Sequence, residues 1–199
     1  MKLFAQFVSF LFHPILFLLL TPFLAVYKHT YSGIAALKWE VFTALFIFFG
    51  IIAFVIGRWF GIFSDFDLSK REERGKFYGI SGLIGATYLA IALSFKGLVF
   101  PLSIVALGIL LGIVVLIIAN RFVKASIHVA LASAFVIGVS YSLNAITLLS
   151  VAWIVPLVAW ARVYLGRHTI QEVISGGILG TAITAFTLLL GRHLLTGRL

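Results

Sequence analysis

Long apolar stretches separated by short polar segments make up most of this chain. Seven such runs are present, at about 9–27, 41–61, 77–95, 99–119, 127–143, 145–161 and 173–190. A helix needs about 20 apolar residues to cross the hydrocarbon core of a bilayer. Within lipid, a helix can pair its own backbone groups, whereas an open sheet cannot. The pattern therefore predicts an all-α fold, a polytopic transmembrane bundle of six or seven helices.

Composition favours the same fold class. The chain has 199 residues, of which 62% are hydrophobic and 11% are charged. A soluble domain is about 25% charged, so this chain has too few polar side chains to cover a water-soluble core. Cysteine is absent, which excludes disulfides and thiolate metal ligands. We expect a single transmembrane domain over residues 1–199, in a multi-pass protein of a prokaryotic cell membrane.

The charge balance is strongly basic. The chain has 15 Lys and Arg against 6 Asp and Glu, a formal net charge of +9. These basic residues lie mainly between apolar runs, where they anchor and orient helices, so we expect membrane lipids and no nucleic acid as partners. Attraction of an anionic lipid headgroup is the second interpretation. The sequence does not indicate an oligomeric state.

Polar segments alternate between the two membrane faces if every run crosses. The segments 62–76, 120–126 and 162–172 then share one face. Five of the six acidic residues lie there, together with His128 and His168. Lys and Arg are also more numerous on this face, which favours the cytoplasmic side. We therefore expect one face to collect nearly all side chains capable of chemistry, whereas His13, His29 and His193 are interpreted as interfacial or terminal residues without a role.

The segment 161–172 is the most informative. In a helix beginning at His168, Glu172 would share a face with that histidine. A carboxylate bound to one ring nitrogen fixes the tautomer and leaves the other nitrogen free, as an activated histidine nucleophile requires. A surface ion pair at the start of a helix is the alternative. Arg162, in the same segment, is a candidate phosphate ligand.

Two further segments supply complementary groups. Ser126 is expected to cap the helix that follows, and helix N-termini bind anions. His128 lies in the first turn of that helix and is a candidate general acid. Arg74, in the most charged segment, carries a planar guanidinium suited to phosphate. The alternative for Ser126 and His128 is an ordinary helix cap followed by an interfacial histidine, and the alternative for the segment around Arg74 is a solvated loop with local ion pairs. Taken together, the three segments indicate phosphoryl transfer through a histidine.

The order and spacing of these residues resemble the type 2 phosphatidic acid phosphatase superfamily of membrane lipid phosphatases and soluble acid phosphatases. The third motif of that family is Ser-Arg, five residues, His, three residues and Asp. Here Arg162, His168 and Glu172 stand at this spacing, with Ala161 in place of the Ser. The resemblance covers roughly residues 60–190, which we call the phosphatase-like core.

The other two motifs are matched in part. The second, Pro-Ser-Gly-His, falls on residues 125–128, where Ser126 and His128 are kept and Ile127 replaces the Gly. The first, Lys, six residues and Arg-Pro, places Arg74 at the Arg position and Asp67 at the Lys position. A negative charge therefore stands where a phosphate-binding lysine is expected.

The resemblance implies a metal-independent phosphatase that needs no cofactor. His168 would be the nucleophile that forms a phosphohistidine, Glu172 would orient it, and His128 would protonate the leaving group. The implied phosphate-binding residues are Arg74, Arg162 and Ser126. The substrate would be a lipid phosphate, such as phosphatidate, phosphatidylglycerol phosphate or a polyprenyl diphosphate.

The departures from the family motifs leave a second function open. Asp67 and Ile127 motivate a non-catalytic lipid-phosphate-binding membrane protein or scaffold. A small transporter fits less well, because the ionisable residues cluster at one face and not at mid-membrane.

Overall fold

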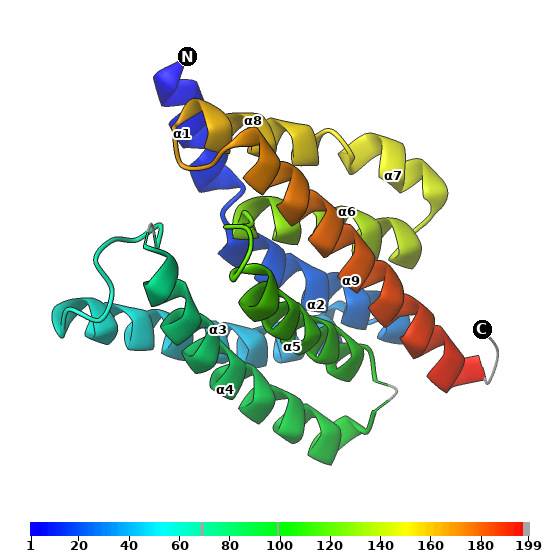
Figure 1. Cartoon of the computed structure of the whole chain (residues 1–199). Coiled ribbons are helices and arrows are strands. Elements are labelled where there is room, and N and C mark those ends of the chain that lie inside the picture. The colour runs from blue at the N-terminus through cyan, green and yellow to red at the C-terminus, as the bar shows by residue number, and fades with distance from the viewer. Residues whose placement is uncertain (69, 99, 197–199) are drawn as a thin grey trace.

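The computed structural model describes residues 1–68, 70–98 and 100–196, and its regular structure is helical (Figure 1). In chain order the helices are α1 (Lys2–Leu11), α2 (Pro14–Thr30), α3 (Gly33–Trp59), α4 (Arg71–Lys96), α5 (Pro101–Ala119), α6 (Ile127–Ser142), α7 (Ala145–Val151), α8 (Ile154–Tyr164) and α9 (Ile170–Thr196). Within these residues, six spans are long and apolar enough to cross a membrane: Lys2–Thr30, Gly33–Trp59, Arg71–Lys96, Pro101–Ala119, Ile146–Tyr164 and Ile170–Leu194. The chain is an all-α, multi-pass integral membrane protein.

The first predicted run is broken near its start. α1 ends at Leu11 and α2 begins at Pro14, whose ring lacks an N–H and fixes φ at a value suited to the first helical position. His13 caps α2, because its Nδ1 accepts a hydrogen bond from the backbone N–H of Ile15 at 3.3 Å. The apolar run at 9–27 therefore lies within one candidate span, Lys2–Thr30, that is broken between Leu11 and Pro14.

The predicted run 145–161 is also divided, into α7 and α8. Pro156 lies in the first turn of α8, where its ring would clash with the carbonyl group of Ala152 if one helix continued through both segments. The preceding run forms α6, which at 16 residues is shorter than the six spans.

Helix α6 lies at the centre of one half of the bundle. It packs against α2, α8 and α9, and Figure 1 shows α9 running alongside it. The core here is built from Phe17 of α2, Val158 of α8, Val173 of α9 and a row of α6 side chains that includes Val129 and Phe135. A second apolar cluster joins α2, α3, α4 and α5.

Helices α6 and α9 approach closely because α9 carries glycines at the contact. A Cβ added to Gly176 would lie 2.5 Å from the carbonyl oxygen of Ser126, and one added to Gly180 would lie 2.1 Å from that of Ala130. No larger residue fits against backbone at these distances. The spacing of these two glycines is the small-residue pattern typical of closely packed membrane helices.

The sequence contains two further pairs of glycines four residues apart, Gly57–Gly61 and Gly108–Gly112, and they behave differently. Gly108 of α5 lies against Thr187 of α9, where an added Cβ would be only 3.0 Å from that side chain, as in a closely packed helix pair. Gly61 instead lies in the turn after α3 with a φ of +71° and open space around it. The Gly57–Gly61 pair is therefore not a helix-packing motif.

Candidate functional site

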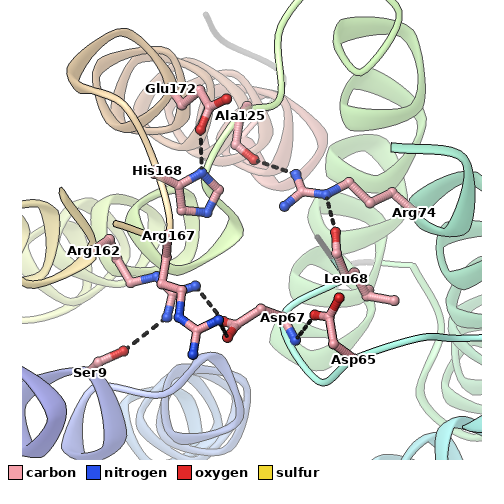
Figure 2. A network of polar contacts seen from close by, with 10 residues as sticks. All are labelled: Ser9, Asp65, Asp67, Leu68, Arg74, Ala125, Arg162, Arg167, His168 and Glu172. Carbon is pink, nitrogen blue, oxygen red and sulfur yellow. Dashed lines mark hydrogen bonds and ion pairs between the residues drawn. The ribbon is translucent and has the colours of Figure 1, made fainter. Parts of the chain in front are cut away.

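Segments that are remote in sequence meet at one end of the bundle. Nη1 of Arg74, in the first turn of α4, donates a hydrogen bond to the carbonyl oxygen of Ala125 at 3.2 Å. The backbone N–H of Ser126 donates to the carbonyl oxygen of Glu172 in α9 at 3.1 Å. The three polar segments expected on one face thus lie together. Figure 2 shows members of all three in one network, including Arg74 of the first segment, Ala125 of the second and His168 of the third.

His168 is fixed by a carboxylate. Its Nδ1 lies 2.8 Å from Oε2 of Glu172, and the residue is 8% exposed. The other ring nitrogen points away from Glu172, toward the middle of the network that contains Arg162 and Asp67 (Figure 2). Since Glu172 occupies one nitrogen, the second is left for chemistry.

The helix that carries Glu172 begins two residues later than predicted, at Ile170. Oε2 of Glu172 also accepts from the backbone N–H of Thr169 at 3.2 Å, and the backbone N–H of Glu172 donates to Oγ1 of Thr169 at 3.3 Å. This reciprocal pair is a capping box. Glu172 therefore both caps α9 and holds His168, although His168 itself lies outside the helix.

The surroundings of His168 favour its neutral form. Burial, followed by the positive charges of Arg162 and Arg74, lowers the pKa of His168 from 6.5 to about 4, although the Glu172 carboxylate acts in the opposite direction. At neutral pH the ring is therefore uncharged. With the Nδ1 proton donated to Glu172, the Nε2 lone pair is available to a phosphorus atom.

Arg162 is a buried cation of the site, with 4% of the residue exposed. Its Nη1 donates to Oγ of Ser9 in α1 at 3.0 Å, and its Nη2 lies 2.5 Å from Oδ1 of Asp67. Nε of Arg162 is buried and has no hydrogen-bond partner among the described residues. Arg162 therefore retains an unused donor inside the protein.

Asp67 stands at the position where the first phosphatase motif has a lysine, and it is part of the site. Its second oxygen lies 3.1 Å from Nη1 of Arg167. Burial alone would raise the pKa of Asp67, but the hydrogen bond from Arg162 and the charges of Arg162 and Arg167 hold that pKa below its ordinary value. Asp67 is therefore a carboxylate anion bound between two guanidinium groups.

Arg74, expected to bind phosphate, is 2% exposed and already contacts two backbone carbonyl groups. Its Nε donates to the carbonyl oxygen of Leu68 at 2.9 Å, in addition to the bond with Ala125. In this arrangement Arg74 joins the loop after α3 to the loop before α6. Its role toward phosphate stays a prediction.

Ser126 is the N-cap residue of α6, but its side chain makes no capping hydrogen bond. The expected side-chain cap is wrong, and the backbone N–H of Ser126 is bound to the carbonyl oxygen of Glu172. Gly176 of α9 packs directly against this backbone, which buries the residue completely. Oγ of Ser126 is left without a partner among the described residues.

A cavity of about 270 Å³ opens beside these groups. Of the predicted site residues, His128 and Arg162 line it. It is completed by Gln6, Ser9, Phe10, His13, Phe66, Asp67, Leu165 and Arg167. The half-buried ring of His128 lies edge to face with the ring of His13, with 5.3 Å between centroids. His128 is also close enough to His168 to interact with it electrostatically.

Sequence reasoning missed the cavity-lining residues near the N-terminus, Gln6 and Ser9 in α1 and His13 in the break after it. These polar residues recur at intervals of three and four, a helical spacing that is visible in the sequence. That polar stripe was a usable signal, but its residues lie outside the predicted phosphatase-like core, residues 60–190. Arg167 was visible only as one more basic residue in a basic segment.

Comparison with known proteins adds no relative. No family model, curated protein or solved structure matches this chain. In the part of the chain that the structure describes, no three His, Cys, Asp or Glu side chains are grouped so as to hold a metal ion. The interpretation of the site therefore depends on its own geometry.

Proposed function

We propose that this chain is a metal-independent membrane lipid phosphatase of the type 2 phosphatidic acid phosphatase kind. It would hydrolyse a lipid phosphomonoester or diphosphate through a phosphohistidine. The observation that carries the proposal is the 2.8 Å contact between Nδ1 of His168 and Glu172, beside the buried Arg162. A neutral, oriented imidazole next to fixed cations is what attack on a phosphate requires.

In the first half of the reaction, Nε2 of His168 attacks phosphorus and the bond from phosphorus to the leaving oxygen breaks. His128, in its imidazolium form, gives its proton to that oxygen and becomes neutral, so the lipid alcohol, or the lipid monophosphate of a diphosphate substrate, departs protonated on that oxygen. Burial, followed by the positive charge of Arg162, lowers the pKa of His128 in the empty site, so the proton must arrive with the substrate, whose phosphate charge favours the imidazolium form. His168 is then phosphorylated, with its Nδ1 proton still directed at Glu172.

In the second half, a water molecule enters at the position of the departed alcohol. Neutral His128 removes a proton from this water, the oxygen attacks phosphorus, and the bond between phosphorus and Nε2 breaks. Inorganic phosphate leaves, His168 returns to its neutral form, and His128 is again an imidazolium. Atoms and charges balance over the two steps, and no metal is needed.

The cations of the site supply the charge stabilisation. Arg162 and Arg167 lie on the two oxygens of Asp67, and a phosphate offers the same kind of oxygen with a larger negative charge. We expect the substrate phosphate to displace the carboxylate from these groups. Nε of Arg162 is a further donor that Asp67 does not use.

A lipid substrate is favoured by where the site lies. The cavity is lined by the loop before α4, the end of α8 and the loop after it, together with α1, the α1–α2 break and the first turn of α6. Loops that join spanning helices are expected at the interface, where lipid headgroups lie. A phosphate attached to an acyl or prenyl chain would reach it with the chain still in the bilayer. Phosphatidate, phosphatidylglycerol phosphate and polyprenyl diphosphates all meet this requirement.

A specific observation favours the second candidate, a non-catalytic lipid-phosphate binder or scaffold. Asp67 neutralises Arg162 and Arg167 in the site. If substrate phosphate does not displace it, a headgroup would be held at the rim of the cavity without reaching His168.

Phosphate release by the purified protein in detergent distinguishes these functions. The substrates are phosphatidate, phosphatidylglycerol phosphate and undecaprenyl diphosphate, each with and without EDTA. We expect release that survives EDTA, is abolished in His168→Ala and is unchanged in His193→Ala, a matched histidine variant near the far end of α9. Full activity in His168→Ala contradicts the proposed nucleophile. Binding of a lipid phosphate without turnover by the unmodified protein favours the scaffold.

A further inference from the structure

His13 lies in the break between α1 and α2, outside every motif that the proposed function uses. It is solvent-exposed on one side and lines the same cavity as His128 and Arg162. Its place at the break follows from Pro14, which starts α2. The backbone of His13 is bonded to both helices, because its N–H donates to the carbonyl oxygen of Phe10 in α1 and its own carbonyl oxygen accepts from the N–H of Leu16 in α2.

The capping bond fixes the state of this ring. Nδ1 of His13 accepts the backbone N–H of Ile15, so that nitrogen cannot carry a proton while the cap is in place. The single proton of the neutral ring is then on Nε2. Protonation of His13 would remove the acceptor and one capping bond of α2. The capped helix thus keeps His13 neutral and limits its rotation.

The contact with His128 joins this fixed ring to the predicted general acid. The ring planes of His13 and His128 are inclined at 85° with centroids 5.3 Å apart, an edge-to-face arrangement that limits how the His128 ring can turn. The charged groups that line the cavity with them are Arg162, Arg167 and Asp67. Of these lining groups, His13 is the one whose ring lies edge to face with the ring of His128.

We propose that His13 is a positioning residue of this site, a neutral imidazole that holds His128 in the orientation from which it protonates the leaving group. This inference rests on the proposed function, and it assigns a role to the N-terminal helices that lie outside the phosphatase-like core. His13 does not itself transfer the proton. If the ring of His13 is removed, the general acid His128 loses its fixed orientation, while the nucleophile His168 and the arginine side chains remain in place.

The test compares two substrates that differ in their need for an acid. Dioctanoyl phosphatidate has an alkoxide leaving group that must be protonated, whereas p-nitrophenyl phosphate releases a stable phenolate without help. The variant is His13→Asn, because Asn also caps helices and can keep the bond to Ile15 while the ring is lost. His13→Phe is the reciprocal variant, which keeps a ring against His128 but loses the cap. His193→Asn is the matched control.

We expect His13→Asn to lower kcat on the phosphatidate at least 10-fold more than kcat on p-nitrophenyl phosphate, because general acid catalysis contributes about 10²–10⁴-fold. His128→Ala should show the same bias, a larger loss on the phosphatidate than on the aryl substrate. His13→Phe should retain more phosphatidate activity, relative to the aryl substrate, than His13→Asn does. His193→Asn should match the unmodified protein on both substrates.

Two results overturn the inference. One is an equal proportional loss on both substrates in His13→Asn, which indicates a purely structural role. The other is no loss on either. If His128→Ala shows the bias and His13→Asn does not, only the role of His13 fails. If His168→Ala still hydrolyses both substrates, the proposed function fails as well.

Discussion

The carboxylate of Asp67 lies 2.5 Å from Nη2 of Arg162, whose side chain is only 5% exposed. Its other oxygen is bound by Arg167. A charge-assisted hydrogen bond of this kind is stronger than one between neutral groups. The protein thus carries its own anion on the cations that the proposed reaction needs, and on this proposal a phosphate must compete with Asp67 for them.

Removing this internal anion should strengthen phosphate binding. In Asp67→Asn the guanidinium groups of Arg162 and Arg167 no longer have a charged partner, so we expect inhibition by inorganic phosphate at about 5- to 10-fold lower concentration. The control is Glu72→Gln, which removes an exposed acidic charge from the start of α4. An unchanged inhibition constant in Asp67→Asn would mean that Asp67 and phosphate do not share these cations.

The two functions of Glu172 can be separated. Glu172→Ala removes both the contact with His168 and the α9 cap, so we expect kcat to fall about 10²–10⁴-fold, by analogy with loss of the orienting carboxylate in other histidine sites. Thr169→Ala removes only the capping partner and should cost about 1 kcal/mol of stability while keeping activity. Activity and thermal unfolding, measured on the same samples, check both expectations. Equal loss of activity in the two variants would show that the cap, and not orientation of His168, matters.

The pKa of His168 predicts how its ring titrates. Burial is the largest cause that lowers this pKa from 6.5 to about 4, so ¹⁵N NMR of labelled histidine should find the ring neutral at pH 5, with His168→Asn identifying the signal. Glu172 opposes the shift, so Glu172→Gln should move the titration lower still. A ring that titrates near its ordinary value would contradict the buried, cation-flanked setting.

The same shift has a consequence for stability. Because the folded-state pKa of His168 is depressed, the unfolded chain binds more protons at this residue between its ordinary pKa of 6.5 and about 4. The free energy of unfolding should therefore fall as pH decreases through that window, and His168 should add no pH dependence above it. Thermal unfolding of His168→Asn should show a smaller decrease over the same range. A parallel decrease in both proteins would assign the acid sensitivity to other groups.

Close packing of α6 on α9 should be the least tolerant contact near the site. A methyl group at Gly180 would lie 2.1 Å from the carbonyl oxygen of Ala130, so Gly180→Ala should destabilise the protein by at least about 1–3 kcal/mol, as overpacking does. The control is Gly79→Ala in α4, where nothing lies within 4 Å and the change should be neutral or stabilising. Equal thermal stability of the two variants would contradict the close approach.

The membrane fold was predictable because apolar length alone specifies a spanning helix. The interruptions were harder to place. Pro14 and Pro156 marked the two breaks, but each stands within a run that is apolar enough to suggest one helix. A short break with its own cap, such as the one at His13, depends on side-chain hydrogen bonds that hydropathy does not report.

Contacts between candidate site residues were predictable where the two residues are close in sequence. His168 and Glu172 are four residues apart, and their contact forms even though the helix begins only at Ile170. Asp67 was noticed only as a mismatch, because its ion pair with Arg162 joins residues 95 positions apart. Contacts of that kind depend on how the helices pack, which no local pattern encodes.

The central claim is that His168 attacks the substrate phosphate. Its most direct test is a single-turnover reaction of the detergent-purified protein with ³²P-labelled phosphatidate, stopped in alkaline denaturant, which preserves phosphohistidine, and followed by mass spectrometry of the labelled peptide. We predict label on His168 that appears before inorganic phosphate and is absent from His168→Ala. Release of phosphate with no covalent label, or with label on another residue, would contradict the account.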